Sequence, residues 1–186
     1  MDFMQKWPDG LGYTEFLDKY ATLEQRRRWD EFHAGVTLTA AQKELLASFR
    51  RDLLVVVVVG AWCGDCIQQC PILDHFARQT PRLQIRYFDR DDHPDLADEL
   101  SICGARRVPS IVYLAEDGAQ CGRAGDRTLS KYRDMASSLD GAVCPTGLVA
   151  PGQSLLASVT QDWLNDIERV QLMLRTSSRL RQKHGD

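Results

Sequence analysis

Several features that would place this chain in other protein classes are missing from its sequence. No stretch approaches the roughly 20 consecutive apolar residues that a membrane-spanning helix needs. Basic residues are slightly outnumbered by acidic ones, 23 to 26, which gives a formal net charge of -3 and a pI near 5.8. Nucleic-acid-binding domains are normally basic, so this charge argues against that class.

The sequence also lacks a recognisable export signal. Residues 1–8 have no basic start followed by an apolar core, which is the pattern of a signal peptide. Without such a signal, the even count of 6 cysteines does not indicate a disulfide framework. We therefore expect a cytoplasmic protein in which Cys70, Cys103, Cys121 and Cys144 are mainly reduced, small apolar residues.

A dithiol motif directly follows the most apolar segment of the chain. The unbroken aliphatic run Leu53–Val59 is typical of a strand that is buried on both faces. Trp62-Cys63-Gly64-Asp65-Cys66 comes next, and a helix is predicted over 66–79. A helix N-terminus presents unpaired N–H groups and partial positive charge, both of which stabilise a thiolate. A strand, a C-x-x-C motif and a helix in this order predict a dithiol redox site.

These residues, together with two prolines, resemble the thioredoxin family. That family carries a Trp before the first cysteine, as Trp62 does here, and a proline within the active-site helix, as Pro71 does. It also has a cis-proline in a Val-Pro dipeptide that leads into a strand, and Val108-Pro109 resembles this segment. The resemblance covers roughly residues 45–140. It implies an α/β thioredoxin-like fold, with a mixed central sheet flanked by helices and with extra helices at both ends.

The pattern outside the motif suits such a fold. Helix starts are predicted by two capping boxes, Thr22-x-x-Gln25 and Thr39-x-x-Gln42. After the active-site helix, the sequence predicts a strand at 83–88 and a short helix that ends at about 101. A β-hairpin follows, with strands at 110–114 and near 120, and then a further helix at 129–139.

We divide the chain into four segments. They are an N-terminal helical extension (1–38), a thioredoxin-like domain (39–141), a Gly- and Pro-rich linker (142–152) and a C-terminal amphipathic helix (153–186). The last helix carries one apolar stripe, from Leu156 to Leu174. This stripe predicts a packing face against either the N-terminal helices or a second subunit, and the second arrangement would be a homodimer.

The family resemblance implies a role for each residue of the motif. Cys63 is the nucleophile, with a pKa lowered from about 8.5 toward about 7 by the helix N-terminus. Cys66 is the resolving thiol, which releases the product from a mixed disulfide. Gly64 permits the tight turn into the helix. Asp65 is either a carboxylate that caps the helix start or a charge that opposes the thiolate.

The resemblance also implies where a substrate docks. The backbone of Val108, beside a cis Pro109, would lie next to the sulfurs and pair with the main chain of the substrate. Arg106 and Arg107 precede it, either as a solvated pair or as cations that favour the thiolate or acidic substrates. Thioredoxins commonly carry a buried Asp where this chain has Val57, so we expect slower resolution, or help from another group or water.

The predicted function is therefore that of a cytoplasmic thiol-disulfide oxidoreductase, a protein-disulfide reductase active in cell redox homeostasis. Its expected partners are disulfide-containing proteins and an electron-donating reductase, without nucleic acid, membrane, metal or other cofactor. Two alternatives remain open. One is a redox-regulated binding module with weak turnover. The other is a zinc or iron–sulfur site with the ligands Cys63, Cys66, Cys70 and Cys103.

Overall fold

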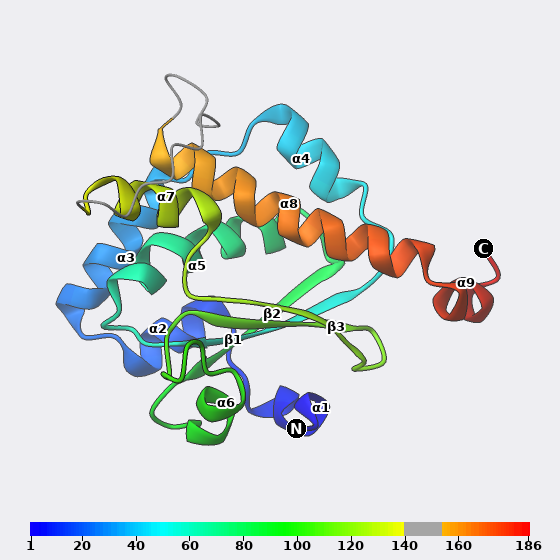
Figure 1. Cartoon of the computed structure of the whole chain (residues 1–186), viewed down its shortest axis with the longest axis horizontal. Helices are drawn as coiled ribbons and strands as arrows, with labels where there is room; N and C mark the ends of the chain where they lie inside the picture. The colour runs from blue at the N-terminus through cyan, green and yellow to red at the C-terminus, as the bar shows by residue number, and fades with distance from the viewer. Residues whose placement is uncertain (140–153) are drawn as a thin grey trace.

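The structure is a computed structural model that describes residues 1–139 and 154–186. The predicted linker, 142–152, lies outside the described residues. Helices at both ends of the chain surround a sheet, as Figure 1 shows. In chain order the elements are α1 (Phe3–Lys6), the 3-10 helix η1 (Trp7–Asp9), α2 (Tyr13–Tyr20), α3 (Leu23–Gly35), α4 (Ala40–Ala47), β1 (Leu53–Val59), α5 (Gly64–Ala77), β2 (Leu83–Asp89), α6 (Pro94–Glu99), β3 (Ser110–Ala115), β4 (Gln120–Ala124), α7 (Leu129–Ser137), α8 (Leu155–Thr176) and α9 (Ser178–His184).

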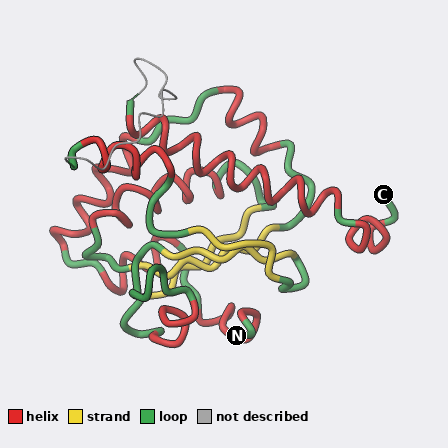
Figure 2. Tube along the Cα trace, viewed as in Figure 1, coloured by secondary structure: helices red, strands yellow, loops and turns green. Residues whose placement is uncertain are grey.

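The described strands form one mixed sheet in the order β2-β1-β3-β4 (Figure 2). β1 is parallel to β2 and antiparallel to β3, and β3 is antiparallel to β4. Every residue of β1 is buried, which explains why this central strand has no polar side chain. Leu11 adds an isolated antiparallel bridge to Tyr87 of β2. The mixed sheet with flanking and terminal helices confirms the predicted fold class.

Helix α8 covers the sheet with the apolar stripe that the sequence predicts. Its side chains Trp163, Ile167 and Val170 are buried. The helix packs mainly on α5, α7 and β4 rather than on the N-terminal helices. Figure 1 shows α5 and α8 on one side of the sheet and α1 and α6 on the other. A homodimer through this helix stays a prediction.

The C-terminal segment is two helices rather than one continuous helix. At Ser177 the backbone is extended, with φ -63° and ψ 118°, which ends α8. The Ser177 hydroxyl then accepts a hydrogen bond from the N–H of Leu180 and caps the start of α9. Sequence periodicity missed this break because a serine is tolerated inside a helix and also favours a cap.

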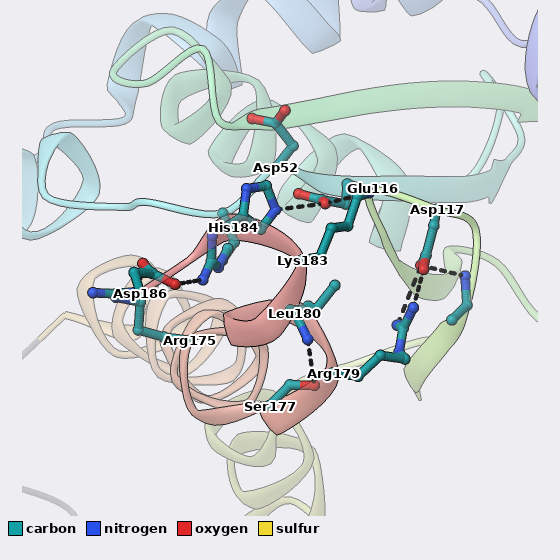
Figure 3. A network of polar contacts seen from close by, with 12 residues as sticks. Asp52, Glu116, Asp117, Arg175, Ser177, Arg179, Leu180, Lys183, His184 and Asp186 are labelled. Carbon is teal, nitrogen blue, oxygen red and sulfur yellow. Dashed lines mark hydrogen bonds and ion pairs between the residues drawn. The ribbon is translucent and has the colours of Figure 1, made fainter.

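Charged contacts attach α9 to the turn between β3 and β4 (Figure 3). Glu116 accepts hydrogen bonds from Lys183 at 2.8 Å and from His184 at 2.7 Å. Arg179 pairs with Asp117 in the same turn. The C-terminal helix is therefore held against the sheet edge by ion pairs as well as by buried Leu180.

The N-terminal extension packs directly against the motif-bearing helix. α3 lies beside α5, and both predicted capping boxes are present, at Thr22 and Thr39. His33 of α3 lies 2.8 Å from a carboxylate oxygen of Asp74 in α5. His75 donates a hydrogen bond to the carbonyl of His33 at 3.0 Å. The extension is thus part of the same packed unit as the sheet. No helix of the described residues is long and apolar enough to span a bilayer.

Candidate functional site

The C-x-x-C motif lies where β1 turns into α5. The N–H of Cys63 donates to the carbonyl of Gly60 at 3.0 Å, and the carbonyl of Cys63 accepts from Ile67 at 3.0 Å, which starts the helix. A Cβ on Gly60 would lie 2.6 Å from the Trp62 ring, so a larger residue here would have to displace that ring. A Cβ on Gly64 would meet nothing within 4 Å. Steric crowding therefore favours glycine at position 60 and does not demand it at position 64, and the role of Gly64 stays a prediction.

The structure brings the motif and the predicted docking segment together. Cys63 is only 8% exposed, and its thiol donates to the carbonyl of Val108 at 3.4 Å. The Val108–Pro109 peptide bond is cis. Cys66 and Cys70 follow on successive turns of α5 and are fully buried. Of these three cysteines, Cys63 is the one nearest the surface.

Both thiols of the motif are hard to ionise in the reduced protein. The hydrogen bond with Cys66 raises the pKa of the Cys63 thiol, and burial raises it further. The backbone N–H groups of Cys66 and Asp65 act in the opposite direction but do not prevail. Burial likewise raises the pKa of Cys66. The lowered pKa predicted for Cys63 is therefore wrong for this state, because the helix N-terminus is outweighed by burial and by the second thiol.

Asp65 is paired with an arginine from a distant loop. Arg127 follows β4, and its guanidinium binds the Asp65 carboxylate from Nε at 3.1 Å and from Nη2 at 2.5 Å. The N-cap residue of α5 is Cys63, which makes no side-chain capping bond. The carboxylate of Asp65 is therefore partly neutralised by a bidentate ion pair, which neither sequence-based interpretation included.

Asp126, next to this arginine, is the most heavily hydrogen-bonded carboxylate near the motif. It accepts from Arg107 at 3.0 Å, from Arg127 at 3.3 Å and from the Tyr132 hydroxyl at 2.5 Å. Burial alone would raise the pKa of Asp126, but the bonds from Tyr132 and the arginines outweigh it and lower the pKa. Sequence reasoning missed Asp126 and Arg127 because only the fold brings the loop after β4 to α5.

A buried amide connects the motif helix to this loop and to the C-terminal helix. Gln69 of α5 donates to the backbone carbonyl of Asp126 at 2.6 Å and accepts from the Trp163 indole at 3.1 Å. Both Gln69 and Trp163 are buried. The position of the Asp126 loop therefore depends on α8, which lies far from the motif in the sequence.

The motif is also held from the N-terminal side. The indole of Trp29 in α3 donates to the carbonyl of Ala61 at 2.8 Å, which fixes the backbone just before Trp62. Trp62 itself is 47% exposed, and the Arg90 guanidinium lies 4.5 Å from its ring centroid. A large aromatic surface is thus presented to solvent beside Cys63, backed by a cation.

An open recess of about 360 Å³ lies over these groups. It unites most of the predicted site residues with the charged residues that sequence reasoning missed. Its walls are formed by Trp62, Cys63, Asp65, Arg90, Arg106, Arg107, Val108, Asp126 and Arg127. Gly64 and Pro109 adjoin these residues in the chain, and Cys66 is fully buried and does not line the recess.

The structure brings together no metal-binding cluster in its described part. Across residues 1–139 and 154–186, no group of three or more His, Cys, Asp or Glu side chains is placed to hold a metal ion. Cys103 is exposed, whereas Cys63, Cys66 and Cys70 are buried. The predicted four-cysteine ligand set therefore does not form.

Comparison with known proteins identifies the family. A family model described as thioredoxin matches residues 10–138. The chain belongs to the thioredoxin family. The match begins well before residue 39, where the sequence predicts the thioredoxin-like domain to start, and so it includes α2 and α3. Membership of this family supports thiol-disulfide oxidoreductase chemistry in general.

Curated relatives and solved structures agree with this family. The thioredoxins of Chlamydia trachomatis and Chlamydia muridarum are 26% and 27% identical to the chain over 84 residues, which are 45% of this chain and 78% of each relative. A Pseudomonas aeruginosa protein of unknown function has a similar structure, with a TM-score of 0.69 and 19% identity over 91% of this chain and 96% of its own. That likeness shows the fold alone, and it extends over most of both chains.

Proposed function

We propose that this protein is a cytoplasmic protein-disulfide reductase, with Cys63 as the attacking thiol and Cys66 as the resolving thiol. The observation that carries the proposal is the arrangement of Cys63. Its sulfur lies at the wall of an open recess, against the carbonyl of Val108, with the second thiol directly behind it. A substrate sulfur can therefore reach Cys63, whereas it cannot reach Cys66.

The first step forms a mixed disulfide. The Cys63 thiolate attacks one sulfur of the substrate disulfide, a new S–S bond forms, and the substrate S–S bond breaks. The leaving substrate thiolate takes up a proton. We expect the substrate backbone to approach beside the carbonyl of Val108, which accepts a hydrogen bond from the Cys63 thiol.

The second step resolves this intermediate. Cys66 loses its proton and attacks the Cys63 sulfur, which releases the second substrate thiol and leaves a Cys63–Cys66 disulfide. The substrate has then gained two electrons and two protons. An electron-donating reductase, or dithiothreitol in the assay, restores the dithiol. Because Val57 is buried where thioredoxins commonly carry a carboxylate, we expect this step to be the slower one.

Disulfide reduction by three variants tests the proposal. With dithiothreitol as donor, the wild-type protein should reduce a disulfide-linked protein such as insulin. Cys63→Ser should abolish the activity, and Cys66→Ser should accumulate covalent mixed disulfides that a mass spectrum assigns to Cys63. Cys103→Ser, which changes an exposed cysteine outside the recess, is the matched control and should remain active.

Two outcomes would reject the reductase. The first is activity that survives Cys63→Ser. The second is a wild-type protein that forms the Cys63–Cys66 disulfide but reduces no substrate, while it binds a partner in only one redox state. That second result would favour a redox-regulated binding module instead.

A further inference from the structure

The recess beside Cys63 contains more positive than negative charge. Four arginines and two aspartates are among its walls. Both aspartates already have partners among neighbouring side chains. Asp65 is bound by Arg127, and Asp126 is bound by two arginines and a tyrosine hydroxyl. Counted alone, the residues that line the recess therefore carry two more positive than negative charges.

Arg107 is the recess arginine that lies next to the predicted docking backbone in the chain. It directly precedes Val108, whose carbonyl accepts the hydrogen bond from Cys63. Its side chain is 41% exposed, and among the described residues only its Nη1 has a partner, Asp126 at 3.0 Å. The remaining N–H groups of this guanidinium are open to a second carboxylate.

Two further arginines extend the cationic wall toward the rim. Arg90 lies over the ring of Trp62 and pairs with Asp91, and Arg106 pairs with Asp98. Asp91 and Asp98 are largely exposed and do not line the recess. Both pairs are bidentate, so Arg90 and Arg106 act on a substrate mainly through long-range attraction, whereas the open N–H groups of Arg107 provide the direct contact with its carboxylate.

We propose that this site selects disulfides flanked by carboxylates, with an Asp or Glu next to the attacked cysteine binding Arg107. The inference rests on the reductase function proposed above and names its substrate class. Electrostatic attraction of this type acts mainly on the rate of encounter and weakens as salt screens it. Two kinds of substrate would offer such carboxylates. One is an acidic protein segment, and the other is glutathione disulfide, a small disulfide with several carboxylates.

Peptides that differ only in flanking charge test the inference. We would measure kcat/KM, with dithiothreitol as donor, for three disulfide peptides whose cysteine is flanked by Glu, Gln or Lys. At low salt the expected order is Glu above Gln above Lys, with a Glu-to-Lys ratio of about tenfold. At about 0.5 M salt this ratio should approach one, because the Debye length falls to a few ångströms.

An arginine variant and a matched control locate the effect. Arg107→Gln should lower the Glu-to-Gln ratio by about threefold or more. Arg82→Gln removes an arginine that is also paired with one aspartate, Asp52, but lies just before β2, at the other end of the parallel strands. It should leave the ratio as in the wild type. Using a ratio within each variant cancels any general loss of activity.

The outcomes separate this inference from the function on which it rests. Equal kcat/KM for the three peptides, or a preference for Lys, in an active protein would overturn the inference and leave the reductase intact. No turnover of any disulfide would overturn both. A higher kcat/KM for glutathione disulfide than for the Glu peptide would identify the small disulfide as the source of the carboxylates, and the reverse would identify a protein segment.

Discussion

The guanidinium of Arg127 binds the carboxylate of Asp65 through two hydrogen bonds, of 3.1 and 2.5 Å, within the C-x-x-C motif. Its remaining nitrogen, Nη1, binds Asp126 at 3.3 Å. One side chain thus joins the first turn of α5 to the loop after β4. This junction shapes the wall of the recess and neutralises the charge that a C-x-x-C motif containing Asp would otherwise place beside a thiolate.

Replacing Arg127 should destabilise the protein. Arg127→Gln leaves Asp65 without its charged partner and removes one of the two arginines that bind partly buried Asp126, so we expect the free energy of unfolding to fall by about 1–3 kcal/mol. Urea denaturation measures this change. Arg106→Gln, which breaks the exposed pair with Asp98, should cost much less. Equal losses for the two variants would show that the Arg127 junction has no special role.

The hydrogen bond between Trp163 and Gln69 should stabilise the site from a distance. Trp163→Phe keeps an aromatic ring in the core but leaves the buried Gln69 oxygen without its donor. We expect a loss of about 1–3 kcal/mol in thermal or urea unfolding. Leu172→Ala, on the exposed face of the same helix, should change stability by less than about 0.5 kcal/mol. If the two variants are equally stable, the bond contributes nothing measurable.

The raised pKa of Cys63 predicts how alkylation depends on pH. Below its pKa, the thiolate fraction of a thiol grows about tenfold per pH unit. The rate at which iodoacetamide modifies Cys63 in the reduced protein should therefore keep rising through pH 9. Cys66→Ala removes the largest cause of the raised pKa and should move the profile to lower pH. A plateau between pH 6 and 8 in the wild-type protein would show instead that the helix N-terminus prevails.

His75 predicts a loss of stability in mildly acidic solution. Burial lowers the pKa of His75 from the usual 6.5, so the unfolded chain binds a proton at this residue more readily than the folded one. The free energy of unfolding should therefore fall as the pH drops from about 6.5 toward the lowered pKa, and this loss is complete below it. His75→Gln, which can still donate to the carbonyl of His33, should show a shallower decline between pH 7 and 5. An unchanged slope would assign the decline to other groups.

Local patterns predicted most of the fold because each depends on neighbouring residues. The aliphatic run of β1 indicates a central buried strand, and the capping boxes at Thr22 and Thr39 mark helix starts, since a side chain there satisfies the backbone three residues on. The break at Ser177 escaped prediction because serine is tolerated inside a helix and also favours a cap, and packing decides between them.

The sequence by itself determined the chemistry of this protein: a dithiol after a buried strand, at the start of a helix, with a Val-Pro segment further on. Only the tertiary structure decided the surroundings of that dithiol. Burial and the second thiol set the direction of the Cys63 pKa shift, and Arg127, Asp126 and Gln69 reach the motif from distant segments. Ionisation and charge pairing depend on distances through space, which spacing along the chain does not encode.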